Sequence, residues 1–86
     1  MAFAVEVSPA ARRQLRKLDR TVQRRVLRRL EALGTNPRPP GVVQLTSPSG
    51  PLYRVREGDW RIVYRVEDDN LLVLVVRIGP RSGVYR

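Results

Sequence analysis

The chain has 86 residues, enough for one domain with one modest core, and 42% of them are hydrophobic, which argues against disorder. Seventeen Lys and Arg against eight Asp and Glu give a formal charge of +9, which favours polyanionic partners, nucleic acid first. The absence of cysteine and histidine excludes disulfides, thiolate catalysis, the usual zinc sites and the commonest general base near neutral pH.

Arginine supplies nearly all of the positive charge, because Lys17 is the only lysine. A GC-rich genome would produce the same bias, so composition permits nucleic-acid binding without requiring it. The N-terminal residues do not resemble a signal peptide, since Glu6 interrupts them. The longest apolar stretch, Leu71–Val76, is too short to span a bilayer. We therefore expect a cytoplasmic protein without a membrane partner.

The N-terminal half predicts a strand followed by two helices. Phe3, Val5 and Val7 alternate with other residues, which favours a short strand. Ser8 is expected to cap a helix that runs from residue 9 to residue 18, with proline at its first position. A second helix is predicted over 20–33, and Gly34 is expected to end it as a C-terminal cap.

The C-terminal half predicts an antiparallel sheet. A proline-rich connector at 36–41 and a short extended piece at 42–45 precede three strands, at 52–56, 60–67 and 71–78. The last of these is apolar at nearly every position, so we expect it to be a central strand. The chain is thus predicted to form a single domain over 1–86 with an α+β fold, in which an N-terminal strand is followed by a two-helix hairpin that packs on one face of an antiparallel sheet.

Strand alternation predicts where the arginines of the sheet point. Trp60, Ile62 and Tyr64 share one face of their strand, and apolar residues of the preceding strand match them. If the apolar faces meet the helices, the arginines lie on the opposite face, namely Arg54, Arg56, Arg61 and Arg65. Like charges on one face cost stability, so an anionic ligand is one explanation and a merely solvated face is the other. The arginines of the second helix are interpreted as its solvated side or as partner contacts.

Three stretches of the sequence are distinctive: Leu33 to Gly41, the hairpin Tyr-Arg-Val-Arg-Glu-Gly-Asp-Trp-Arg-Ile-Val-Tyr at 53–64, and Val76 to Arg81 with the tail Val84-Tyr85-Arg86. With these stretches, the chain resembles the RelE/ParE superfamily of toxins over nearly its full length. The hairpin is the most specific of the three. The resemblance implies a RelE-like fold and, for the RelE branch, a ribosome-dependent endoribonuclease that cuts mRNA in the ribosomal A site.

The resemblance also implies roles for individual residues. Arg61, Arg81 and Tyr85 correspond to catalytic positions, and Arg54 and Arg56 to phosphate-binding positions. Strand alternation adds Arg65 as an RNA-binding candidate. No metal or other cofactor is expected, because the reaction would use the ribose 2′-OH as an internal nucleophile.

Two alternatives to the ribonuclease remain open. A ParE-like toxin of the same fold would poison DNA gyrase without any nuclease activity. A degenerate toxin would have lost activity because Pro80 replaces a titratable residue of many relatives and because the tail is short. All three hypotheses imply a cognate antitoxin rich in acidic and hydrophobic residues, and a toxin–antitoxin complex that binds operator DNA.

Overall fold

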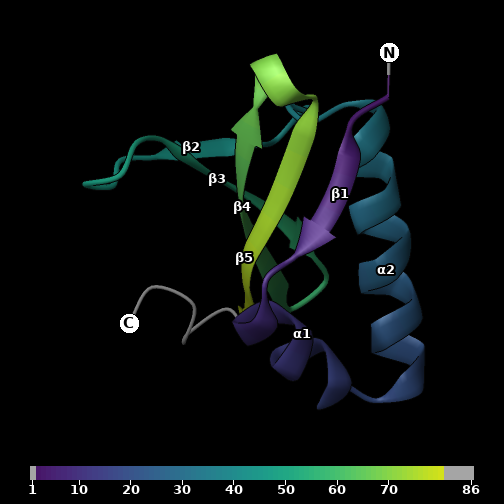
Figure 1. Cartoon of the computed structure of the whole chain (residues 1–86). Coiled ribbons are helices and arrows are strands. Elements are labelled where there is room, and N and C mark those ends of the chain that lie inside the picture. Colours follow the sequence, from purple (N-terminus) through teal and green to yellow (C-terminus); the bar gives the residue numbers. More distant parts are fainter. Residues whose placement is uncertain (1, 81–86) are drawn as a thin grey trace.

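The computed structural model describes residues 2–80, in which two helices cover one face of a five-stranded sheet (Figure 1). The strand order is β1-β5-β4-β3-β2. β1 pairs with β5 in parallel, and the other neighbouring strands are antiparallel, which confirms the α+β fold with one parallel strand added at an edge. The elements are β1 (Ala4–Val7), α1 (Pro9–Arg16), α2 (Arg20–Thr35), β2 (Val43–Leu45), β3 (Leu52–Glu57), β4 (Trp60–Glu67), the 3-10 helix η1 (Asp68–Asn70) and β5 (Leu72–Pro80).

Each of the two α-helices begins at a side-chain cap. The Ser8 hydroxyl accepts a hydrogen bond from the Ala11 N–H at 3.1 Å, and Pro9 occupies the first turn, where a missing N–H costs nothing. The Asp19 carboxylate accepts from the Val22 N–H at 3.0 Å and starts α2. Only residues 17–19 lie between the two helices, so α1 ends two residues earlier than the sequence predicted.

Gly34 has a different role from the one predicted, and the expectation that it ends the second helix is wrong. Helix α2 continues to Thr35, and Asn36 is its C-cap. A Cβ atom at Gly34 would lie 2.9 Å from the Phe3 carbonyl oxygen, and the Phe3 N–H donates to the Gly34 carbonyl at 2.7 Å. Glycine is therefore required here by the close approach of the chain leading into β1, rather than by helix termination.

The hydrophobic core lies between the helices and the inner strands. Val26 of α2 and Ile62 and Tyr64 of β4 are fully buried, as are Val73 and Val75 of β5. Burying side chains of this size contributes about 1.5–3 kcal/mol each relative to leaving them in water. The apolar strand predicted to be central is indeed an inner strand, because β1 and β4 flank β5 on its two sides.

A β-bulge divides β5 into two halves of opposite parity. Tyr64 pairs with Val75, and Val63 pairs with Arg77, so Val76 has no partner in β4. Helix α1 and its N-cap supply hydrogen-bond partners for backbone groups at the bulge. The Ser8 hydroxyl donates to the Val76 carbonyl at 3.1 Å. Next to the bulge, the Ile78 N–H donates to the Gln14 side-chain oxygen at 2.8 Å. The bulge therefore has specific partners in the first helix.

Candidate nucleic-acid interface

The sheet face that points away from the helices carries arginines on three neighbouring strands. Directly paired residues of adjacent strands project to the same face, so the strand register shows which side chains lie together. One row across the sheet consists of Val43, Arg54, Val63 and Arg77. The next row consists of Arg56, Arg61 and Gly79. We call this surface the open face and define it by Arg54, Arg56, Arg61, Val63, Arg65 and Arg77.

The placement of Arg54, Arg56 and Arg61 is the one that strand alternation predicted. Arg56 and Arg61 are directly paired, and Cα atoms of such pairs lie about 4.5–5.5 Å apart. Val63 lies between Arg54 and Arg77 in its row and is only 5% exposed. Arginine stems can cover an apolar neighbour of this kind while their charged ends stay in water. The roles assigned to the three arginines remain predictions.

Arg77 joins this set because of the bulge. Strict alternation from the buried Val73 and Val75 would turn Arg77 toward the helices, but the additional residue Val76 reverses the parity. Arg77 is consequently exposed opposite Val63. The sequence left its face undecided, since the length of the preceding turn could not be fixed.

Arg65 holds a loop. Its guanidinium donates to the Ser49 carbonyl at 2.8 Å and to the Ser49 hydroxyl at 2.9 Å. These bonds connect β4 with the loop between β2 and β3, which Ser47 also closes by donating to the Gly50 carbonyl at 2.6 Å. The prediction that Arg65 binds RNA phosphate is not tested by these contacts.

Two of the predicted catalytic residues, Arg81 and Tyr85, lie outside the residues that the structure describes. The last residue described is Pro80, which pairs with Trp60 at the end of β5. The preceding residue of β5, Gly79, pairs with Arg61.

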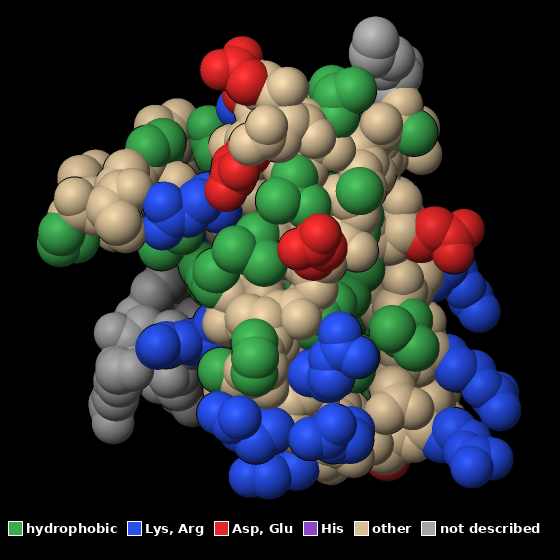
Figure 2. Space-filling model, viewed as in Figure 1, with side chains coloured by type: hydrophobic (Ala, Val, Ile, Leu, Met, Phe, Trp, Pro, Cys, Tyr) green, Lys and Arg blue, Asp and Glu red, His purple; other side chains and the backbone are tan. Residues whose placement is uncertain are grey.

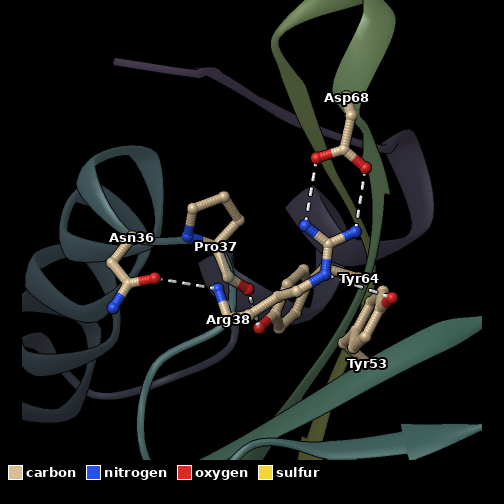
Figure 3. Close-up of polar contacts among 6 residues, drawn as sticks. All are labelled: Asn36, Pro37, Arg38, Tyr53, Tyr64 and Asp68. Carbon is tan, nitrogen blue, oxygen red and sulfur yellow. Dashed lines mark hydrogen bonds and ion pairs between the residues drawn. The ribbon is translucent and has the colours of Figure 1, made fainter. Parts of the chain in front are cut away.

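A cluster around Arg38 fixes the connector between α2 and β2 (Figure 3). The Arg38 guanidinium donates two hydrogen bonds to the Asp68 carboxylate, at 3.0 and 2.9 Å, and one to the Tyr53 hydroxyl at 3.3 Å. The Tyr64 hydroxyl donates to the Pro37 carbonyl at 2.6 Å. Sequence analysis did not find this cluster, because Arg38 and Asp68 are 30 residues apart and lie in segments without periodicity.

The contacts in this cluster shift two pKa values of interest. The hydrogen bonds from Arg38 hold the pKa of the Asp68 carboxyl below its usual value. Burial raises the pKa of Tyr64 to about 12, while the charges of Arg29 and Arg38 act in the opposite direction. Tyr64 is thus a neutral hydrogen-bond donor at physiological pH, as its bond to Pro37 requires.

Basic side chains also gather outside the open face. Figure 2 shows Lys and Arg crowded over the lower end of the molecule, where α1 lies, and along the right side, where α2 runs. Helix α1 and the residue after it carry four exposed cations, Arg12, Arg13, Arg16 and Lys17. Among residues 2–80, no group of three or more His, Cys, Asp or Glu side chains is arranged to hold a metal ion. Neither helix of this part of the chain combines the length and apolarity needed to cross a membrane.

Comparison with known proteins decides the family. The model for the ParE toxin of the type II toxin–antitoxin system parDE matches residues 5–85. The chain belongs to the RelE/ParE family of type II toxins. The two-helix, five-strand arrangement matches solved structures of this family.

Individual relatives of this toxin cover nearly the whole chain. The putative toxin RelE1 of Methanocaldococcus jannaschii is 30% identical over 100% of this chain and 98% of its own length. The mRNA interferase toxin RelE of Escherichia coli K12 is 29% identical over 99% of this chain and 92% of its own length. Among solved structures, the archaeal RelE–RelB complex of Pyrococcus horikoshii OT3 matches with a TM-score of 0.83 and 26% identity, over 98% of this chain and 100% of that one.

Proposed function

We propose that this toxin is an endoribonuclease that cleaves mRNA in the ribosomal A site and so inhibits translation. The observation that carries the proposal is the pairing of Arg56 with Arg61 on the open face, with Arg54 and Arg77 in the next row. Cations arranged in this way on neighbouring strands suit an RNA backbone. The similarity to a relative named mRNA interferase supports the same activity.

The reaction would use the substrate's own ribose as nucleophile. The 2′ oxygen forms a bond to the adjacent phosphorus while the bond from phosphorus to the 5′ oxygen breaks, giving a 2′,3′-cyclic phosphate and a 5′ hydroxyl. The 2′-OH gives up its proton, and the leaving 5′ oxygen takes one up. Catalysis requires in-line geometry and stabilisation of the negative charge that builds up on the phosphorane oxygens.

Guanidinium groups suit the charge-stabilising task, because they offer fixed donors and never lose their charge. Arg61 and Arg81 would clamp the scissile phosphate. Arg54 and Arg56 would bind flanking phosphates and polarise the 2′-OH, with Arg65 as a further phosphate contact. Tyr85 would stack on a base or take part in proton transfer. The ribosome would position the substrate, which compensates for the absence of histidine.

Arg61→Ala tests the proposal most directly. Losing one preorganised charge-stabilising donor typically costs about 10²–10³ in rate, so mRNA cleavage on translating ribosomes should fall by that order. Arg61→Lys keeps the positive charge without the planar fork and should retain part of the rate. Arg12→Ala on α1 removes the same charge away from the open face and should cleave normally. Unchanged cleavage by Arg61→Ala, with the fold confirmed by circular dichroism, would refute the site assignment.

A second candidate function follows from the family match. Because the matching model describes the ParE toxin of parDE, a gyrase poison without nuclease activity is the alternative. Mapping of mRNA ends after induction separates the two. Cuts within translated codons support the ribonuclease, whereas intact mRNA together with DNA breaks and gyrase binding supports the alternative.

A cognate antitoxin is part of the proposal. Relatives have been solved in complex with RelB, and a basic domain of this charge suits a partner rich in acidic and hydrophobic residues that folds on binding. The toxin–antitoxin complex would bind operator DNA, and the toxin would act in the cytoplasm, where ribosomes are. Co-expression with the product of an adjacent small acidic reading frame should give a stable complex and restore growth.

A further inference from the structure

A second basic site lies on the helix side of the sheet, away from the open face. A shallow groove of about 290 Å³ runs between α2 and the end of the β3–β4 hairpin, and it is lined by Arg25, Arg28, Arg29, Ala32 and Glu57. We call it the α2 groove. Its volume is several times the roughly 30 Å³ that one water molecule occupies, so it can hold a larger ligand.

The helix places the groove arginines on one stripe. Arg25, Arg28, Arg29 and Ala32 follow the spacing i, i+3, i+4 and i+7, which brings them to one side of α2. Like charges at these spacings destabilise the helix. Arg24 belongs to the same helix but does not line the groove. The arginines of α2 therefore fall into those that line the groove and those, such as Arg24, that do not, a difference that the sequence alone did not show.

The turn between β3 and β4 contacts one of these side chains, that of Arg25. Arg25 forms an ion pair with Glu57, with 3.5 Å between Nε and the carboxylate oxygen. A Cβ atom on Gly58 would lie 2.7 Å from an Arg25 guanidinium nitrogen, and Gly58 has a φ of 61°. Glycine is needed here for the positive φ of the turn, and its lack of a side chain also leaves room for the flexible end of Arg25 over the turn.

The electrostatics of the groove are only partly balanced. Three arginines against one glutamate leave two positive charges in excess. The Arg29 Nε atom is buried and has no hydrogen-bond partner among residues 2–80. Because this atom is covered, it is the excess charge of the groove lining that points to an anionic ligand.

The lining favours a phosphate over a peptide. An amphipathic protein segment gains most of its binding energy by filling apolar pockets, and the groove offers only Ala32 as an apolar side chain. Arginine forks at close spacing match phosphate oxygens bidentately. The groove also borders the same hairpin end that carries Arg56 and Arg61 on its other side, because adjacent residues of β3 face opposite ways.

We propose that the α2 groove binds a second backbone phosphate of the RNA that the open face holds, so that the RNA is gripped on both sides of the β3–β4 hairpin. This inference rests on the proposed function only in assigning RNA as the ligand. It does not depend on cleavage, and binding can therefore be measured with an RNA that cannot be cut.

The experiment measures binding of the full chain to a short 2′-O-methyl RNA at several salt concentrations. Each lost phosphate contact lowers the slope of log K against log salt by about 0.7 for a single strand. Arg28→Ala should lower the slope by that amount and weaken binding at low salt, while Arg28→Lys should restore much of it. Arg24→Ala is the matched control, since it removes one exposed arginine of the same helix outside the groove, and it should leave the slope unchanged.

Equal slopes for Arg28→Ala and Arg24→Ala overturn the groove as a phosphate site. If Arg28→Ala weakens binding of the antitoxin but not of the RNA, the groove belongs to a protein partner and the inference is also wrong. Arg56→Ala serves as the reference for the open face. Loss of RNA binding by Arg56→Ala alone refutes the groove and keeps the proposed function, whereas loss by neither variant counts against both.

Discussion

Arg56 and Arg61 are directly paired across the β3–β4 hairpin, so two guanidinium groups project from neighbouring strands onto the same face. Like charges placed opposite one another destabilise a sheet. The fold retains this pair at the end of a hairpin whose helix-facing pairs, Val55 opposite Ile62 and Tyr53 opposite Tyr64, are buried. The RNA binding proposed for the pair would explain why the unfavourable arrangement is kept.

Relieving this repulsion should stabilise the fold. Arg56→Thr places a strand-favouring neutral residue opposite Arg61 and is expected to add about 0.5 kcal/mol, within the range for cross-strand pairs. For a domain of this size, that corresponds to a rise of about 3 °C in Tm. The same variant should bind RNA more weakly. Arg56→Lys keeps the charge, and a similar rise in its Tm would show that repulsion is not the cause.

Loss of the Tyr64 hydroxyl should weaken the fold substantially. Tyr64→Phe removes the donor to the Pro37 carbonyl and leaves a buried acceptor unsatisfied, which costs about 1–3 kcal/mol. Urea unfolding measures the change. Tyr53→Phe is the matched control, because its hydroxyl only accepts one longer bond, 3.3 Å, from Arg38. Equal losses in the two variants would contradict the importance given to the Tyr64–Pro37 bond.

Stability should fall at alkaline pH because of the same residue. The pKa of Tyr64 is raised by burial from 10.0 to about 12, so below pH 10 the phenol is protonated in both the folded and the unfolded chain. Between these two values the unfolded chain loses the proton first, and the free energy of unfolding decreases as pH rises. Tyr64→Phe should lack this part of the decrease. Parallel stability curves for the two proteins in that interval would refute the prediction.

Gly58→Ala should destabilise the hairpin through two separable effects, the positive φ and the contact with Arg25. An alanine in the left-handed region costs about 1 kcal/mol. Gly41→Ala isolates this backbone effect, because Gly41 also has a positive φ, 86°, but a Cβ there meets nothing within 4 Å. The excess cost at Gly58 should disappear when Gly58→Ala is made in an Arg25→Ala background. Additive losses in that double-mutant cycle would disprove the contact.

Much of the fold could be predicted from local patterns. Alternation located the strands that carry Tyr53, Val55 and Ile62 on the core side, and it placed Arg54, Arg56 and Arg61 together on the other. A cap followed by proline located the start of α1 at Ser8. These features succeed because each depends on residues close in the sequence, where geometry follows directly from side-chain periodicity.

Features that depend on distant contacts could not be predicted. The parallel pairing of β1 with β5 brings Val5 beside Val73, and the bond between Arg38 and Asp68 joins two irregular segments. Gly34 follows the last apolar residue of α2, where glycine commonly ends helices, yet its role is to admit the chain at Phe3. The α2 groove likewise requires knowing that the hairpin turn lies beside Arg25.

Val76 has a consequence for comparing relatives of this toxin. Because this residue has no counterpart in β4, every position of β5 that follows it is one step out of phase with the positions before it. A homologue lacking the residue would keep its equivalents of Arg77 and Ile78 on the faces they occupy here, because the pairs Tyr64–Val75 and Val63–Arg77 would then follow one another without interruption. An ungapped alignment with such a homologue would therefore exchange the two sides of the sheet for the residues of β5 after Val76, and the gap position should be chosen by which residues are buried.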